Sequence, residues 1–193
     1  MRILYCHGFA SSFDPSTEKV TKLSALGQVR GFDIDYTQPA YQLIEHARAL
    51  FDPAQVDVIV GTSMGGWLAA ALGSRLALPF VAINPSIMPA QTLRKYIGTG
   101  MDYQQRPYTL TEAVVDTYPP IARKGRGLIL LDEDDEVIDA QVTYNALSAH
   151  YPVHCFPGGH HRFAHMTEAL PLIVDFLQGA SAADAGLIKD KAT

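Results

Sequence analysis

Residues 58–66 read VIVGTSMGG, and an Ala- and Leu-rich segment follows them. This pattern predicts a strand, a sharp turn at Ser63 and a helix. The residues two before and two after such a serine come too close to other backbone for a Cβ atom, so Gly61 and Gly65 fit there. The turn would present the Ser63 hydroxyl at the carboxyl edge of a sheet and direct the Met64 N–H towards a developing oxyanion. Ser63 is therefore the candidate nucleophile.

A serine between glycines also occurs in tight turns without a catalytic role and in phosphate-binding loops. The sequence contains no GxxxxGK[ST] motif, and no lysine lies near Ser63, which argues against a phosphate loop. The succession of strand, turn and helix favours a nucleophile over a purely structural turn.

Short apolar runs recur along the chain and predict about six strands. They occupy residues 2–6, 28–36, 56–60, 79–83, 128–131 and 151–156. Segments between them predict helices over residues 16–26, 40–51, 63–76, 138–149 and 163–178. Strands that alternate with helices of this length form parallel sheets, and right-handed crossovers place helices on both faces. The predicted fold class is α/β, a mostly parallel sheet in a single domain over residues 1–178.

Residues 85–127 interrupt this alternation with prolines and glycines, and two short helices are expected there, over residues 90–97 and 109–118. Long connections often form lids or binding loops, so this segment is expected to be a cap-like insertion. Its candidate substrate-pocket residues are Ile87, Met88, Tyr96 and Met101. Residues 179–193 are mostly small and polar, and are expected to form a loosely ordered tail.

A serine nucleophile needs a base and an acid, and in this fold class the order is Ser, Asp or Glu, then His. His160 and His161 follow the last predicted strand, after a glycine pair that lets the loop fold back towards Ser63. Asp135 stands in an acidic loop just before the next predicted helix, and Asp132 at the strand end is the second candidate. The acid would hold the imidazole tautomer and stabilise the imidazolium.

The 193-residue chain is 48% hydrophobic and 18% charged, which suits a globule with its own core. Its net charge is −5, and it has no basic run of the kind that binds nucleic acid. No stretch reaches the ~18 unbroken apolar residues of a membrane span, and the first residues lack the features of a signal peptide. A cytoplasmic location is expected, with Cys6 and Cys155 as free thiols.

Four histidines gather near the C-terminus: His154, His160, His161 and His165. The sequence has no HExxH motif and no paired CxxC spacing, so neither a metal nor another cofactor is expected. His7 is expected to order the turn after the first strand through its ring nitrogens. Trp67 is expected in the core, and Cys6 as a small buried hydrophobe.

Five motifs together resemble those of the small bacterial α/β-hydrolase esterases of the YqiA type (UPF0227-like): His7-Gly8-Phe9, Gly61-Thr-Ser63-Met-Gly65-Gly66, Asn84-Pro85-Ser86, Asp135-Glu136-Val137 and Gly158-Gly159-His160-His161. The resemblance extends to about Gln178 and implies a reduced α/β-hydrolase fold. It implies a catalytic triad of Ser63, Asp135 and His161. It also implies that the Phe9 N–H is a second oxyanion donor beside that of Met64.

These observations predict a serine hydrolase that cleaves small-molecule carboxylic esters or acyl thioesters through an acyl-serine intermediate. Two alternatives stay open. The same triad would serve an amide or peptide hydrolase, and the fold also occurs in binding proteins without activity. The complete Ser, Asp, His order favours an enzyme. The sequence does not indicate an oligomeric state.

Overall fold

The computed structural model describes the backbone of residues 1–189 and the side chains of residues 1–179. At its centre lies a six-stranded sheet with the strand order β2-β1-β3-β4-β7-β8. The strands are β1 (Arg2–Cys6), β2 (Gln28–Gly31), β3 (Val58–Thr62), β4 (Phe80–Ile83), β7 (Gly127–Asp132) and β8 (Val153–Phe156). Every neighbouring pair is parallel, which confirms the predicted fold class.

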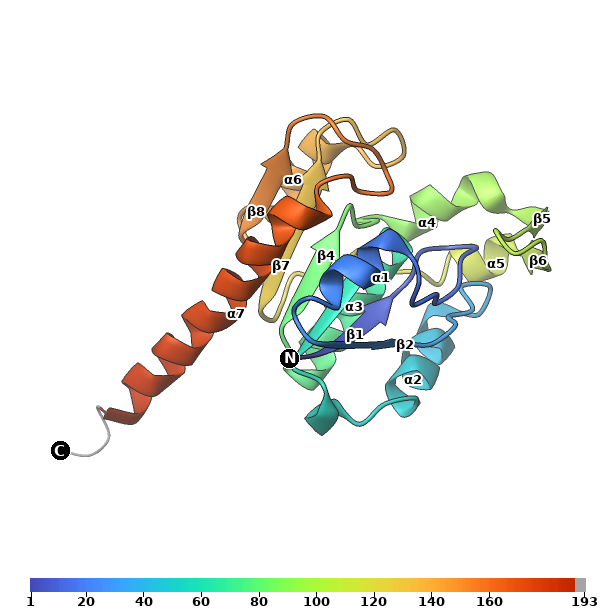
Figure 1. Cartoon of the computed structure of the whole chain (residues 1–193). Helices are drawn as coiled ribbons and strands as arrows, with labels where there is room; N and C mark the ends of the chain where they lie inside the picture. The colour runs from blue at the N-terminus through green and yellow to red at the C-terminus, as the bar shows by residue number, and fades with distance from the viewer. Residues whose placement is uncertain (190–193) are drawn as a thin grey trace.

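Helices cover both faces of this sheet (Figure 1). On one face pack α1 (Glu18–Leu23) and α7 (Met166–Lys189), and on the other α2 (Ala40–Ala49), α3 (Met64–Leu76) and α6 (Ala140–Leu147). Because successive strand residues point to opposite faces, Ile59 joins the core beneath α3 while Val60 joins the core beneath α1 and α7. The strands β3, β4 and β7 are buried along their whole length, as expected for a sheet covered on both sides.

The strand predicted over residues 28–36 ends at Gly31. Beyond that point the chain leaves the sheet, and the backbone N–H of Ile34 donates to His7 Nε2 at 2.8 Å instead of to a neighbouring strand. A short 3₁₀ turn, Pro53–Gln55, then leads from α2 into β3.

The insertion 85–127 contains α4 (Pro89–Leu93), the 3₁₀ turn Arg94–Tyr96, β5 (Gly98–Met101), β6 (Pro107–Leu110) and α5 (Glu112–Val115). The short helix predicted over 90–97 corresponds to α4 and its following turn. The helix predicted over 109–118 is wrong in its first part, because residues 107–110 pair antiparallel with β5. Gly100 permits this hairpin, since a Cβ there would lie 2.5 Å from the Tyr108 ring. Local sequence carries little information about a partner strand.

Helix α7 begins and ends later than the predicted segment 163–178. It runs from Met166 to Lys189, while residues 163–165 form part of a loop in which Phe163 has a left-handed φ of 65°. In Figure 1 the helix extends away from the sheet. The backbone up to Lys189 is thus helical. The expectation of a loosely ordered tail over residues 179–193 stays a prediction, and residues 190–193 lie outside the described residues.

Cys6 in β1 and Cys155 in β8 are free thiols with three strands between them. Burial raises the pKa of the Cys6 thiol to about 12, so it stays protonated at neutral pH, as expected for a small core residue. Within residues 1–189, no helix is both long and apolar enough to cross a membrane.

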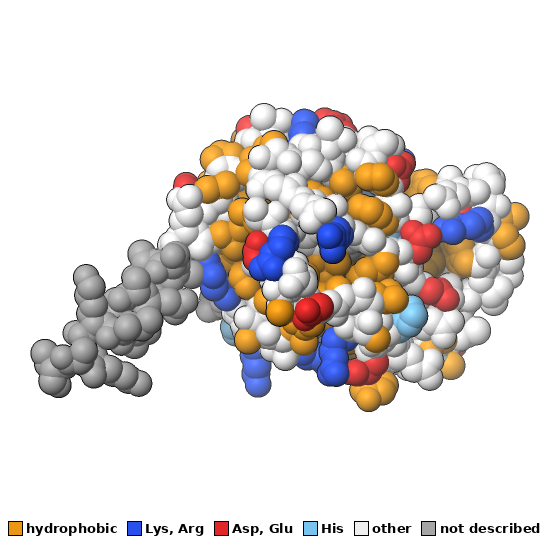
Figure 2. Space-filling model, turned by 60° about the horizontal axis from the view of Figure 1, so that its bottom comes forward, with side chains coloured by type: hydrophobic (Ala, Val, Ile, Leu, Met, Phe, Trp, Pro, Cys, Tyr) orange, Lys and Arg blue, Asp and Glu red, His pale blue; other side chains and the backbone are white. Residues whose placement is uncertain are grey.

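The surface in view in Figure 2 carries Lys and Arg side chains interspersed with Asp and Glu and with apolar groups. Neither sign of charge gathers into one patch on this face. The absence of a nucleic-acid partner stays a prediction.

Candidate active site

Ser63 stands at the turn between β3 and α3, at the carboxyl edge of the sheet. Its backbone adopts φ 58° and ψ −121°, a conformation that costs about 1–3 kcal/mol. A Cβ on Gly61 would overlap the Gly65 carbonyl, and a Cβ on Gly65 would overlap the Cys6 carbonyl. The Ser63 N–H donates to Ile83 O on β4 at 3.0 Å. The glycines and this hydrogen bond together hold the serine in its strained conformation.

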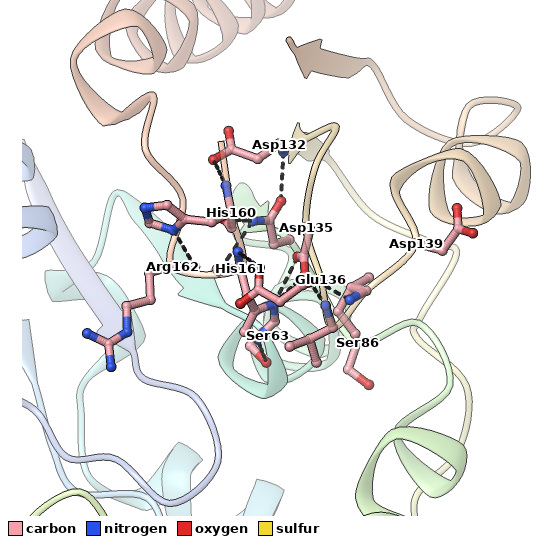
Figure 3. Close-up of polar contacts among 12 residues, drawn as sticks. Ser63, Ser86, Asp132, Asp135, Glu136, Asp139, His160, His161 and Arg162 are labelled. Atoms are coloured by element: carbon pink, nitrogen blue, oxygen red, sulfur yellow. Dashed lines mark hydrogen bonds and ion pairs between the residues drawn. The ribbon is translucent and has the colours of Figure 1, made fainter. Parts of the chain in front are cut away.

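His161 links Ser63 to a buried carboxylate (Figure 3). Its Nε2 lies 3.0 Å from Ser63 Oγ, and its Nδ1 lies 2.9 and 2.8 Å from the two carboxylate oxygens of Asp135. The Asp135 side chain is only 1% exposed, and its Oδ1 also accepts the N–H groups of Val137 and Ile138 at 2.8 Å. A proton on Nδ1 shared with the carboxylate leaves Nε2 free to accept the Ser63 hydroxyl proton.

The other two candidates from the sequence point elsewhere. His160 is exposed, and its Nδ1 accepts the Arg162 N–H at 3.2 Å. Asp132 is fully buried and contacts His165 Nδ1 at 2.7 Å. Among the side-chain hydrogen bonds of the described residues, none joins His160 or Asp132 to Ser63. The structure therefore brings Ser63, His161 and Asp135 together and leaves the two alternatives out.

Two further residues hold the loop that carries His161. Glu136 accepts the His161 N–H at 2.9 Å, and this hydrogen bond lowers the pKa of Glu136. Asn84, buried after β4, donates through Nδ2 to the carbonyls of His160 and His161 at 3.2 and 3.3 Å. Both residues belong to the motifs that carry the family resemblance. Nothing else in the sequence signals their roles, because bonds from a side chain to a distant loop leave no periodic pattern.

The turn after β1 lies beside Ser63, since a Cβ built on Gly8 would lie 3.4 Å from Ser63 Cβ. His7 orders this turn: its Nδ1 lies 2.8 Å from Gly8 O, and its Nε2 accepts the Ile34 N–H at 2.8 Å. Burial lowers the pKa of His7, consistent with a neutral ring that donates from Nδ1 and accepts at Nε2. The expected structural role of His7 is confirmed.

The two predicted oxyanion donors lie where the turn after β1 meets the turn at Ser63. Phe9 follows Gly8, and Met64 is the first residue of α3. Neither amide appears as a donor in the turn, loop or cap hydrogen bonds of the described chain. The first N–H groups of a helix have no acceptor within the helix, so the Met64 N–H can donate a hydrogen bond to an incoming oxygen.

Aromatic side chains stand next to Phe9. The Tyr96 ring lies 5.0 Å from the Phe9 ring, centroid to centroid, and Tyr108 meets Phe9 edge-on at 5.1 Å. The tip of the β5–β6 hairpin joins the same turn, since the Tyr103 N–H donates to Ala10 O at 3.0 Å. The insertion thus contacts the chain directly after the predicted oxyanion residue. That Tyr96 lines a substrate pocket stays a prediction.

The other predicted pocket residues differ in their surroundings. Ile87 is half-buried and follows Ser86, whose N–H donates to Ser63 O at 3.1 Å. Met88 and Met101 are 36% and 60% exposed. Ile87 is therefore next in the chain to a residue that hydrogen-bonds to the backbone of the nucleophile, whereas Met88 and Met101 face solvent in this structure.

A cleft of about 330 Å³ lies elsewhere, between the loop after β2 and helix α2, lined by residues 32–35, 38, 42–43 and 46–47. It includes neither Ser63 nor any predicted pocket residue, so it is not the predicted substrate site. Among the described side chains, no group of three His, Cys, Asp or Glu residues is placed to hold a metal ion.

A parallel sheet covered on both faces, with a strained serine between β3 and α3 at its carboxyl edge, defines the α/β-hydrolase fold. Solved structures share it. Est1E from Butyrivibrio proteoclasticus superposes with a TM-score of 0.66 at 15% identity, over 96% of this chain and 88% of its own. The carboxylesterase CesB from Bacillus subtilis gives a TM-score of 0.62 at 15% identity, over 92% and 84%.

The profile of the uncharacterised protein family UPF0227 matches residues 2–178, and the chain belongs to this family. A UPF0227 protein of Shewanella loihica is 29% identical over 178 residues, covering 86% of this chain and 95% of the relative. Another, from Vibrio parahaemolyticus, is 24% identical over 180 residues, covering 90% and 98%. The family expected from the sequence motifs is confirmed.

Proposed function

We propose that this protein is a serine hydrolase that cleaves carboxylic esters or acyl thioesters of small molecules. The observation that carries the proposal is the hydrogen-bonded chain from Ser63 Oγ through His161 to Asp135, with contacts of 3.0 and 2.8 Å. It lies at a strained strand-to-helix turn, which is where this fold presents a nucleophile. The name of CesB as a carboxylesterase, on the same fold, supports the same class of reaction.

In the proposed mechanism, Ser63 Oγ attacks the carbonyl carbon of the substrate while His161 Nε2 takes the hydroxyl proton. The carbonyl oxygen becomes an oxyanion that accepts from the N–H groups of Phe9 and Met64. The tetrahedral intermediate collapses, His161 returns the proton to the departing alcohol or thiol, and an acyl-serine remains. Water then attacks the acyl-serine while His161 takes a proton from it. The second tetrahedral intermediate collapses, His161 returns the proton to Ser63 Oγ, and the carboxylic acid leaves.

The surroundings of the three side chains support these roles. Asp135, almost fully buried, holds the proton on His161 Nδ1 and stabilises the imidazolium that forms during each step. Its fixed position saves the entropy of orienting the base during the reaction. Water is the only co-reactant in this scheme, so it requires no metal or other cofactor.

The packed aromatic rings of Phe9, Tyr96 and Tyr108 form an apolar surface. This surface, called the aromatic wall below, is evidence that the substrate has an apolar acyl group. These rings stand beside the proposed oxyanion donor, so the acyl chain would lie along them when the carbonyl oxygen reaches the Phe9 N–H. Burial of each methylene against such a surface stabilises the bound substrate by about 0.8 kcal/mol. Affinity should therefore rise with chain length until the wall is covered.

A panel of substrates tests the proposal. Purified protein is assayed with p-nitrophenyl esters from acetate to octanoate, the matching acyl thioesters, and the matching p-nitroanilides, with Ser63→Ala as the control. Hydrolysis of esters or thioesters that disappears in Ser63→Ala supports the proposal. Faster cleavage of anilides than of esters would assign the site to amide hydrolysis. No hydrolysis by folded wild-type protein would favour a binding protein.

A further inference from the structure

The structure contains a second carboxylate–imidazole pair, Asp132–His165, in addition to Asp135–His161. Asp132, the last residue of β7, is fully buried, and its Oδ1 lies 2.7 Å from Nδ1 of His165. The His165 ring stacks on Phe156 at 5.1 Å between centroids, with 6° between the ring planes. Stacking fixes the ring so that Nδ1 faces the carboxylate.

The other oxygen of Asp132 binds the loop that carries His161. Its Oδ2 accepts the N–H of His160 at 3.1 Å and the N–H of Ala164 at 2.7 Å. One donor precedes His161 in the chain and the other follows it. Gly159 lets the loop come this close, because a Cβ there would overlap the carboxylate of Asp132.

The loop is held from several elements at once. Carbonyls are held by Asn84 and by Lys19 of α1, whose Nζ donates to Arg162 O at 2.6 Å. The remaining N–H groups from residue 161 to residue 163 donate to Glu136, to His160 Nδ1 and to His160 O. Every backbone N–H from residue 160 to residue 164 therefore has an acceptor within the protein. Asp132 is the member of this set that is itself fully buried and takes two of these donors.

We propose that Asp132 and His165 are positioning residues for His161: the carboxylate fixes the backbone on both sides of the base, and His165 fixes the carboxylate. This inference rests on the proposed function, since it assigns the pair to the geometry of that reaction. Among the side-chain hydrogen bonds of the described residues, none joins Asp132 or His165 to Ser63. Their effect would therefore reach the substrate through the His161 imidazole. A misplacement of the base by about 1 Å costs up to about 10²-fold in rate.

Two substitutions at His165 separate its hydrogen bond from its stacking. His165→Phe keeps an aromatic ring against Phe156 but removes the donor to Asp132. His165→Asn loses the ring but can place its amide N–H near the position of Nδ1. We expect His165→Phe to lower kcat about tenfold with KM within twofold of wild type, and His165→Asn to restore kcat to within about threefold. Asp132→Leu, which keeps the branched shape of the side chain but has no acceptors, should lower kcat about 10²-fold.

Rates are expressed per mole of Ser63 that a fluorophosphonate labels at completion, so unfolded protein does not count. The control is Leu147→Ala on α6, which removes buried volume away from the loop and should lower Tm without lowering kcat. If His165→Phe and Asp132→Leu lower Tm as this control does but keep kcat within twofold, the pair is merely structural and the proposal is wrong. Equal loss of kcat in His165→Asn and His165→Phe would also overturn it.

A second readout does not depend on catalysis. Proton NMR of the wild type at low temperature should show a strongly downfield resonance from the Nδ1 proton shared by His161 and Asp135, which His161→Ala identifies. The inference expects this resonance to be lost in His165→Phe and retained in His165→Asn. If the wild type hydrolyses no substrate but the resonance behaves in this way, the proposed function fails and the positioning role stands. An unchanged resonance in His165→Phe overturns the positioning role alone.

Discussion

The Asp135–His161 pair and the Asp132–His165 pair have similar carboxylate–imidazole distances but different surroundings. Their carboxylate–imidazole contacts are 2.8 and 2.7 Å, and both carboxylates are buried. The two pairs differ in the groups to which they are further hydrogen-bonded. In the first pair the imidazole continues to Ser63 Oγ at 3.0 Å, whereas in the second the carboxylate continues to the loop backbone.

An Asp–His pair is therefore not by itself a mark of a catalytic base. In the first pair the carboxylate sets the tautomer and the outer imidazole nitrogen is turned towards a hydroxyl group. In the second pair the imidazole of His165 contacts Asp132 Oδ1. The other carboxylate oxygen, Oδ2, accepts two backbone N–H groups of the loop. The first arrangement suits proton transfer, and the second suits a fixed loop.

The largest effect expected on the first pair comes from His161→Ala. Removing the base should lower kcat by about 10³-fold or more, because the oxyanion donors and the nucleophile remain but no group takes the serine proton. The matched control is His160→Ala, whose exposed ring faces away from Ser63 and whose loss should cost at most about tenfold. Steady-state hydrolysis of p-nitrophenyl acetate on both variants decides it. An inactive His160→Ala beside an active His161→Ala would exchange their roles.

Asp135→Asn should lower kcat by about 10²-fold, between the two histidine variants. The amide keeps the volume but can present a donor to His161 Nδ1, which favours the wrong tautomer. The control is Asp139→Asn, four residues along the chain, where the exposed side chain caps α6 by accepting the Val142 N–H at 2.9 Å. Asn caps helices nearly as well as Asp, so this variant should keep the wild-type rate. Similar losses in both variants would speak against a special role for Asp135.

A substitution at Gly159 tests how closely the loop packs against Asp132 of the second pair. Gly159→Ala should lower the free energy of unfolding by about 3 kcal/mol, because it adds an overlap with Asp132 to the cost of a Cβ at positive φ. Gly98→Ala is the control: φ there is +112° but nothing lies within 4 Å of the new Cβ, so a loss of about 1 kcal/mol is expected. Urea unfolding measures both. Equal losses would show that the loop does not press against Asp132.

A smaller effect is expected from His7, whose side chain is buried. Burial lowers its pKa in the folded protein, while the unfolded chain has a histidine pKa of ~6.5. Below pH ~6.5 the unfolded chain binds a proton that the folded protein excludes, so stability falls as the pH decreases from ~6.5 towards the lower folded pKa. His7→Gln, which keeps an acceptor for the Ile34 N–H, should lose this dependence.

The exposed His46 on α2 supplies the matching control, since His46→Gln should leave the pH dependence of wild type in place. Urea unfolding at pH 7.5, 6.5 and 5.5 compares the three proteins. A slope in His7→Gln as steep as in wild type would place the acid sensitivity on another group.

The sequence predicts the sheet and its helices well because the apolar pattern of each segment indicates which of its own residues are buried. Ser63 was identifiable because its turn requires glycine at both Gly61 and Gly65, a constraint written in adjacent residues. The choice between His160 and His161 depends on which ring a loop turns inward, and that is decided by side chains such as Asn84 from distant strands. The β5–β6 hairpin was missed for a related reason, since strand pairing depends on the partner rather than on local pattern.

The central claim is that Ser63 is an activated nucleophile, and one labelling experiment tests it most directly. The full-length protein is treated with a fluorophosphonate, and the adduct is located by digestion and mass spectrometry, with Ser63→Ala and His161→Ala alongside. One adduct per chain on the peptide containing Ser63, absent in Ser63→Ala and strongly slowed in His161→Ala, is the predicted result. Labelling at another residue, or none in folded wild-type protein, would contradict the account.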